Sequence, residues 1–131
     1  MEKWSEKRQF GNKGEEIATK FLISNGFEIK ERNFLRKYGE IDIVARSKDN
    51  VFHFIEVKSV SRESTDGDKK DEFRPEDNIT PEKIRSLSRV IQVYIEEKKL
   101  DDFDWVFSII TVKIDEKNKV ARVKFIEDIV L

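Results

Sequence analysis

The spacing of hydrophobic residues predicts seven helices and strands along the chain. In the first of these segments the hydrophobic residues recur at the spacing of a helix. Residues 13–25 are predicted to form this helix. Asn12 and Glu15 stand three residues apart, as an N-cap residue and its reciprocal carboxylate do, and Gly26 marks the stop. The apolar stripe consists of Ile17, Ala18, Phe21 and Leu22.

Five further segments alternate apolar and polar residues or form short apolar runs, which are typical of strands. The polar link 47–50 makes the second and third strands a hairpin, and the turn 115–119 joins the last two. The predicted strands are residues 27–33, 41–45, 51–60, 103–114 and 120–126.

A second helix is predicted between the third and fourth strands. Thr80 followed by Pro81 is a favourable cap and first helical residue, and the helix is expected to end near Lys99. This helix is long enough to connect two parallel strands. The sequence therefore predicts an α/β fold with a mixed five-stranded sheet flanked by two helices, in the order α-β-β-β-α-β-β. The apolar face of the second helix consists of Ile84, Leu87, Ile91, Tyr94 and Ile95.

The length of 131 residues fits one domain, residues 1–131. Residues 1–10 are expected to form a flexible tail. Residues 61–78 contain seven acids and four bases, with Gly67 and Pro75 as breakers, and are expected to form a mobile surface loop.

The amino-acid composition limits the partners and the metal ligands that this chain can use. The 26 Lys and Arg residues nearly balance the 27 Asp and Glu residues, so a nucleic-acid partner would need a local basic patch. The absence of cysteine excludes disulfides and thiolate sites, and His53 is the single histidine, which excludes multi-histidine zinc sites. Oxygen ligands are then the natural metal chemistry. The apolar runs are far too short to cross a bilayer, and we expect a soluble, cytoplasmic protein.

Charged residues interrupt two apolar strands. The period of two places Glu40, Asp42 and Val44 on one face of their strand and Ile41, Ile43 and Ala45 on the other. In the next strand Glu56 and Lys58 share a face with Phe52 and Phe54. Ionised groups among apolar ones are costly unless they are paired or bind a cation. His53 falls on the opposite face and is favoured as a packed structural residue.

The turn between these strands decides whether the carboxylates meet. If the turn is the three residues 48–50, Asp42 pairs directly with Glu56, with Cβ atoms about 5 Å apart. A two-residue turn would place them on opposite faces. Two close carboxylates stay ionised when a divalent cation or Lys58 holds them.

Such a cluster supports phosphodiester hydrolysis. Mg²⁺ or Mn²⁺ could be held by Asp42, Glu56 and the backbone carbonyl of Val57, with Glu15 completing the shell. Lys58 would orient the attacking water or stabilise charge on the phosphate. The alternatives are a plain capping role for Glu15 and a salt-bridge patch for Glu56 and Lys58.

Five motifs along the chain resemble, in order, those of the YraN-like bacterial family. This family is similar in turn to archaeal Holliday-junction resolvases and to the PD-(D/E)xK nuclease superfamily. The resemblance implies a restriction-endonuclease-like core, with Glu15, Asp42, Glu56 and Lys58 as the metal-binding and catalytic set. The motifs are residues 11–15 (GNKGE), 39–42 (GEID), 56–58 (EVK), the stretch 75–83, and 103–104 (FD).

The chain differs from the family pattern after Lys58, where the family usually continues with Thr-Arg and this sequence has Ser59 and Val60. Arg62 is the basic residue that could replace the missing arginine. In the second helix Lys83, Arg85 and Arg89 are candidate phosphate contacts, although a solvated helix face explains them equally well.

Two functions are therefore expected. The first is a Mg²⁺- or Mn²⁺-dependent endonuclease that acts on DNA, including branched or repair intermediates. The second is a nucleic-acid-binding module that keeps the nuclease fold and does not cut. Resolvases cut two strands symmetrically as dimers, so the resemblance also implies a homodimer.

Overall fold

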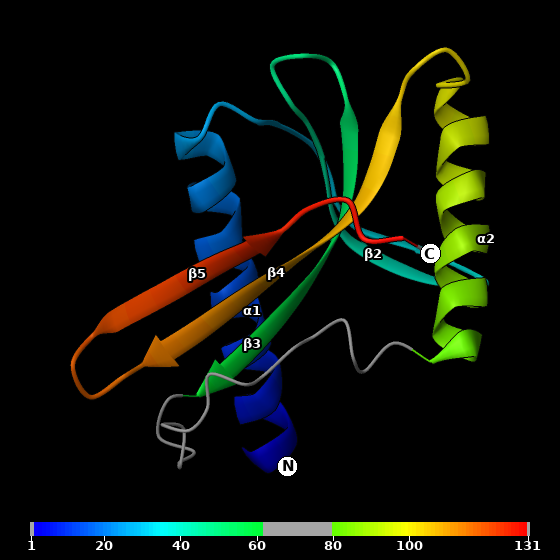
Figure 1. Cartoon of the computed structure of the whole chain (residues 1–131). Helices are drawn as coiled ribbons and strands as arrows, with labels where there is room; N and C mark the ends of the chain where they lie inside the picture. Colours follow the sequence, from blue (N-terminus) through cyan, green and yellow to red (C-terminus); the bar gives the residue numbers. More distant parts are fainter. Residues whose placement is uncertain (1, 62–79, 131) are drawn as a thin grey trace.

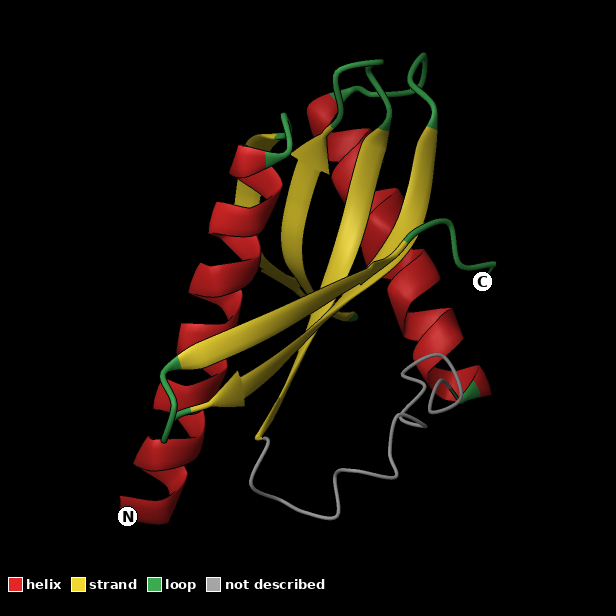
Figure 2. Ribbon diagram, turned by 60° about the vertical axis from the view of Figure 1, so that its left-hand side comes forward, coloured by secondary structure: helices red, strands yellow, loops and turns green. Residues whose placement is uncertain are grey.

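The computed structural model describes residues 2–61 and 80–130, with the side chains of residues 2–7 left aside. Five strands form one mixed sheet in the order β1-β2-β3-β4-β5, and the two helices cover opposite faces of it (Figures 1 and 2). The predicted α/β class and element order are confirmed, and both are consistent with a restriction-endonuclease-like core. The elements are α1 (Glu2–Ser24), β1 (Glu28–Arg36), β2 (Gly39–Arg46), β3 (Phe52–Ser61), α2 (Pro81–Lys98), β4 (Trp105–Asp115) and β5 (Val120–Ile126).

The predicted parallel pair is β3 with β4, in register from Phe52 opposite Trp105 to Ser61 opposite Ile114. The chain between these strands contains α2, which is the predicted crossover helix. The other three neighbouring pairs of the sheet are antiparallel. Hairpins suffice for the antiparallel pairs, whereas a parallel pair needs a long connection.

Alternate residues of the strands build two separate cores, because successive side chains of a strand point to opposite faces. One lies under α1 and the other under α2. The α1-side cluster contains buried Ala18, Leu22, Ile43, Ala45, Ile55, Ile110, Val112 and Ile114. The α2-side cluster contains buried Phe34, Ile41, Val44, Phe52, Phe54, Leu87, Val90, Ile91, Tyr94, Ile95, Phe107 and Ile109.

Aromatic residues confirm which face each strand position occupies. The buried His53 packs edge-on against Phe27, with ring centroids 5.0 Å apart, and lies 3.3 Å from Ser108 through Nδ1 and Oγ. It is the structural histidine predicted from the parity of β3. Phe103 packs against Phe52 at 5.2 Å.

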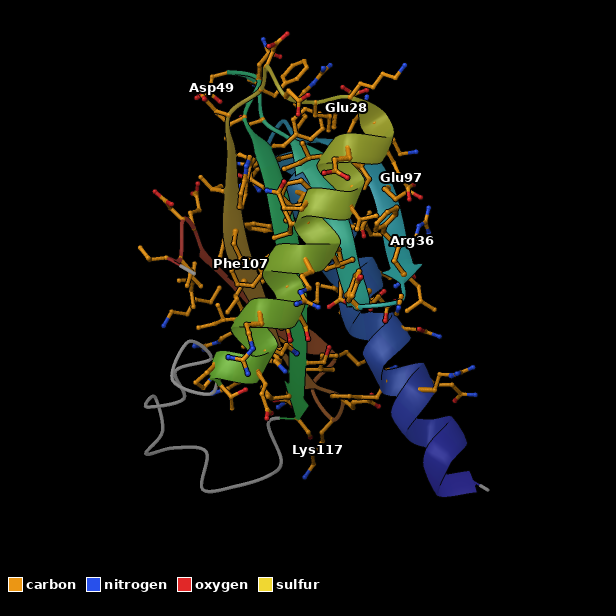
Figure 3. The ribbon with its side chains drawn as sticks, turned by 90° about the vertical axis from the view of Figure 1, so that its right-hand side faces the viewer. Glu28, Arg36, Asp49, Glu97, Phe107 and Lys117 are labelled. Carbon is orange, nitrogen blue, oxygen red and sulfur yellow. The ribbon has the colours of Figure 1, made fainter. Side chains whose placement is uncertain are left out.

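The ends of α2 follow the sequence prediction. Thr80 caps the first turn, its hydroxyl oxygen accepting a hydrogen bond from Lys83 N at 3.1 Å, and Lys99 closes the helix in a left-handed conformation. The far end of α2 is tied to β1, where the Arg36 guanidinium donates to both carboxylate oxygens of Glu97 at 2.7 and 2.9 Å (Figure 3). Such paired hydrogen bonds fix orientation as well as distance.

The predicted start of the first helix is wrong. α1 begins at Glu2, so residues 2–10 are helical where a tail was expected, and Asn12 lies inside the helix. Gly14 lies inside α1, and a Cβ at this position would collide with the Ser59 side chain of β3. The glycine allows the helix to approach the sheet closely.

The expected mobile loop, residues 61–78, lies outside the described residues except for Ser61, which ends β3. Neither helix, over the residues described, combines the length and apolar character needed to cross a bilayer.

Candidate functional site

The β2–β3 hairpin has the register that brings Asp42 and Glu56 level. Ser47 N donates to Val51 O at 2.9 Å, so the turn is the predicted three residues, 48–50. The paired ladder runs from Arg46 opposite Phe52 to Ile43 opposite Ile55, and it stops one residue before the two acids. Beyond that point the Asp42 carboxylate bridges the strands, because its Oδ2 accepts from Val57 N at 2.8 Å.

The sheet opens here because β1 and β2 change direction together. Asn33 of β1 has a φ of 53°, a left-handed value that asparagine tolerates better than most residues. After Asn33, Phe34 enters the α2-side cluster, and its partner Ile41 follows. The prediction that Ile41 shares a face with Ile43 is therefore wrong, since Ile43 lies in the α1-side cluster.

Four carboxylates gather around this opening, which we call the acidic cluster: Glu15 of α1, Glu40 and Asp42 of β2, and Glu56 of β3. The pKa of Asp42 is raised to about 7, mainly by burial and additionally by the charges of Glu15, Glu56 and Glu40. The hydrogen bond from Val57 N acts in the opposite direction. The surroundings of Asp42 therefore make its ionisation costly.

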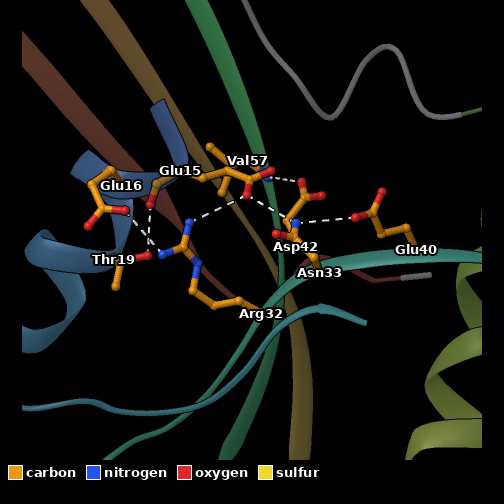
Figure 4. Close-up of polar contacts among 8 residues, drawn as sticks. All are labelled: Glu15, Glu16, Thr19, Arg32, Asn33, Glu40, Asp42 and Val57. Atoms are coloured by element: carbon orange, nitrogen blue, oxygen red, sulfur yellow. Dashed lines mark hydrogen bonds and ion pairs between the residues drawn. The ribbon is translucent and has the colours of Figure 1, made fainter. Parts of the chain in front are cut away.

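Asn33 holds two members of the acidic cluster in place (Figure 4). Its Nδ2 donates to Glu15 Oε1 at 3.1 Å and to Glu40 Oε2 at 3.2 Å. Glu15 is 17% exposed whereas its neighbour Glu16 is 55% exposed, as the helical spacing predicts for the two positions. Asn33 thus connects α1 to β2 through one amide group.

Arg32 supplies positive charge behind Glu15. Its NH2 lies 3.6 Å from Glu15 Oε1 and its NH1 3.2 Å from Glu16 Oε1, while the buried Nε has no hydrogen-bond partner. Sequence reasoning missed both Arg32 and Asn33. The one available signal was an asparagine inside a strand, where this residue is disfavoured.

Glu56 is paired with two lysines. Its Oε2 lies 3.1 Å from Lys58 Nζ and 3.0 Å from Lys83 Nζ, and the carboxylate side chain is only 13% exposed. Lys83, a candidate phosphate contact, is therefore engaged by the acidic cluster in this structure. Its positive charge comes from α2, so the cluster draws on both helices.

The remaining basic candidates are not brought to the acidic cluster. The Arg89 guanidinium lies over the ring of Tyr38 at 5.1 Å, and Arg85 is an exposed residue of α2. Arg62 lies outside the described residues.

A cavity of about 320 Å³ lies between the acidic cluster and α2. Three of the four clustered acids line it, and Glu15 lies outside its lining. In the described part of the chain, no three acidic or histidine side chains stand in an arrangement that could hold a metal ion. The lining residues are Tyr38, Gly39, Glu40, Asp42, Glu56, Lys83, Ser86, Leu87 and Val90.

Comparisons with known proteins agree on one family. The family model described as "Uncharacterised protein family UPF0102" matches residues 14–112, which include all four acids of the cluster and Lys58. A UPF0102 protein of Campylobacter fetus is 43% identical over 92% of this chain and 92% of its own length. Those of Sulfurovum sp. and Helicobacter hepaticus are 43% and 47% identical, over 93% and 71% of this chain and 94% and 74% of their own lengths.

Proposed function

The chain belongs to the UPF0102 family, and we propose that its acidic cluster is the active centre of a divalent-metal-dependent endonuclease that hydrolyses DNA phosphodiester bonds. One observation carries the proposal: Asp42 and Glu56 come from adjacent strands to line one cavity at the place where their ladder opens. Where the ladder opens, backbone hydrogen bonds between β2 and β3 are lost and two like charges come close together. Both effects destabilise a sheet that has only a structural role.

The donor atoms are of the kind that Mg²⁺ and Mn²⁺ prefer. In the described arrangement no three acids are grouped to hold an ion, so the carboxylates of Asp42, Glu56 and Glu15 would have to move together to bind it, with the Val57 carbonyl as a backbone ligand. The raised pKa of Asp42 fits this role, because a cation would relieve the repulsion among the acids. Glu56 would have to exchange a lysine partner for the ion. When bound, the ion polarises the scissile phosphate and lowers the pKa of a bound water.

The chain's own residues have distinct roles in this proposal. Lys58 lies at the exposed side of Glu56, where its ammonium can orient a water or neutralise charge on the phosphate. Arg32 and Asn33 hold Glu15 toward the cluster and are positioning residues. Lys83 holds the Glu56 carboxylate in place through their ion pair at 3.0 Å.

The test is cleavage of labelled linear, single-stranded, flapped and four-way DNA with Mg²⁺ or Mn²⁺. Glu56→Gln is expected to lower the rate at least about 100-fold. The matched control is Glu16→Gln, an exposed glutamate of α1 that points away from the cavity, and it should cleave like the wild type. Cleavage that survives Glu56→Gln would contradict the assignment.

A second function is favoured by the charge balance at Glu56. Two lysines already compensate this carboxylate, so the charge of Glu56 is balanced without an ion. This arrangement suits a nucleic-acid-binding module that retains the nuclease fold and does not cut. DNA binding by the wild type without cleavage of any substrate, with either metal, would select this second function.

A further inference from the structure

The second halves of β3 and β4, and the part of β5 that pairs with β4 there, carry a row of positive charges beside the acidic cluster. Their registers place Lys58, Thr111 and Lys124 side by side across three strands. Two residues further along β4, Lys113 lies between Val60 of β3 and Arg122 of β5. We call the four cations the basic strip: Lys58, Lys113, Arg122 and Lys124.

The four residues share one face of the sheet. Ile110, Val112 and Ile114 of β4 are buried in the α1-side cluster, so Thr111 and Lys113 between them point to the other face. In β5 the odd-numbered Val123 and Phe125 pack against that same cluster, which places Arg122 and Lys124 opposite. The basic strip therefore lies on the face that carries Glu56 and α2.

The buried core of this face does not extend as far as the basic strip. The α2-side cluster contains Phe54 but no later residue of β3, and Ile109 but no later residue of β4. β4 and β5 continue away from α2 toward the turn that joins them (Figure 1). Arg122 and Lys124 are exposed and Lys113 is half-buried.

The strip is costly for the isolated chain. Lys113 and Arg122 are direct cross-strand partners, and like charges in that position destabilise a sheet. Within the described residues none of Lys113, Arg122 and Lys124 forms an ion pair, while Asp115 at the far end binds Asn118. A polyanion laid across the strands would supply the missing negative charge.

Thr111 adds an observation independent of charge. Its Oγ1 is buried and has no hydrogen-bond partner, although the residue is only 8% exposed and lies between Lys58 and Lys124. A buried hydroxyl normally finds a partner. A phosphate oxygen held between the two lysines would provide an acceptor beside it.

We propose that the basic strip binds the phosphate backbone of duplex DNA and leads it to the acidic cluster, a role that rests on the proposed nuclease function. Lys58 joins the two regions, because it belongs to the strip and contacts Glu56 at 3.1 Å. Residues two apart on a strand are separated by about 6.6 Å and neighbouring strands by about 4.8 Å, so the cations cover a patch wide enough for several phosphates. The overall charge of −1 excludes general polyanion binding and makes this local patch necessary.

The test measures binding apart from cleavage, by fluorescence anisotropy of a labelled duplex in EDTA over a range of salt concentrations. The double variant Lys113→Gln/Lys124→Gln is compared with Lys20→Gln/Lys99→Gln, which removes the same charge from two exposed positions, one in α1 and one at the C-cap of α2. Loss of two phosphate contacts should lower the slope of log affinity against log salt by about 1.8 and weaken binding at 0.1 M salt at least about tenfold. The control should bind like the wild type.

Equal losses in both double variants, or no loss in the strip variant, would overturn the basic strip as the binding surface, and so would a wild type that binds no duplex. Circular dichroism melting of each variant separates lost binding from lost folding. The strip variant should melt no lower than the wild type, because Lys124 is exposed and Lys113→Gln removes the like-charge pair with Arg122. Intact strip-dependent binding with no cleavage of any substrate would contradict the nuclease proposal alone.

Discussion

The two halves of β3 differ although they form one continuous strand. Residues 52–55 are buried and lie between β2 and β4, whereas residues 56–61 are all partly exposed and are paired with β4 alone. The first half contributes apolar side chains to both cores, and the second begins with Glu56 and continues to Lys58. Loss of the β2 ladder is what separates the half that stabilises the fold from the half that carries the charges.

The difference between the two halves of β3 shows where a small domain can carry charged functional groups without disturbing its apolar core. The α2-side cluster ends with the covered half of β3, so polar groups beyond it on that face do not interrupt apolar packing, whereas the α1-side cluster continues on the other face through Ile110, Val112 and Ile114. Asp42 marks the border, since its carboxylate takes the place of the next ladder bond by accepting from Val57 N. The following substitutions test this division, in order of expected effect on the free energy of unfolding.

The largest effect is expected from Phe54→Ala in the buried half. Phe54 is fully buried and packs against Tyr94 and Trp105, with ring centroids 5.6 Å apart in both pairs. Its truncation should lower the free energy of unfolding by about 3–5 kcal/mol, measured by urea denaturation. Glu56→Gln, two residues away, should change it by less than about 1 kcal/mol, because both lysine partners are partly exposed. If Phe54→Ala and Glu56→Gln lowered the free energy of unfolding by similar amounts, the two halves of β3 would not differ in their contribution to stability.

Asp42→Asn should stabilise the protein in a pH-dependent way. The pKa of Asp42 is raised to about 7, so the folded chain binds a proton that the unfolded chain releases near pH 4. The free energy of unfolding therefore falls as the pH rises from about 4 to about 7, and the asparagine variant escapes this loss. We expect it to exceed the wild type by roughly 2–4 kcal/mol at pH 8 and to approach it near pH 4.

Urea denaturation at pH 4.5 and pH 8 measures this difference, with Glu16→Gln as the exposed control that should show no such trend. A constant offset between Asp42→Asn and wild type at both pH values would show that burial does not perturb this carboxyl group.

Mn²⁺ should stabilise the charged half. Saturation at a hundredfold excess over Kd adds about 2.7 kcal/mol to the free energy of unfolding, which raises Tm in a thermal melt. The increase should be larger at pH 8 than at pH 6, because Asp42 must lose its proton to bind the ion. Asp42→Asn should abolish it, while Glu16→Gln should retain it. An equal rise in Tm for Asp42→Asn would place the ion elsewhere.

Gly14→Ala tests how closely α1 approaches the charged half of β3. The added Cβ would collide with Ser59, so we expect a net loss of about 1–2 kcal/mol in the free energy of unfolding. Gly11→Ala is the matched control: no atom lies within 4 Å of its Cβ, and the substitution should stabilise the helix by about 0.5–1 kcal/mol. Denaturation of the two variants gives opposite signs if the close approach is real, and the same sign if it is not.

The local pattern of the chain was sufficient for most of the fold. The period of two in residues 52–58 assigned Phe52, Phe54 and Glu56 to one face, and the Thr80-Pro81 pair set the start of α2. For the turn at 48–50 the sequence offered two alternatives, and the structure has the three-residue turn that brings Asp42 level with Glu56. These features follow from contacts between near neighbours in the chain, for which spacing and side-chain type carry the information.

Tertiary structure decided what depends on residues distant in the chain. The local spacing predicts Asn12 as the cap of the first helix, whereas α1 begins at Glu2, and the close packing of Gly14 against Ser59 of β3 is a contact that local spacing does not indicate. The left-handed turn of Asn33, which moves Ile41 to the other face, is set by its pairing with β2 and by its bonds to Glu15 and Glu40. A sequence pattern assigns each residue a preference, whereas the energy of a strained backbone or a crowded carboxylate is fixed by what the folded chain places beside it.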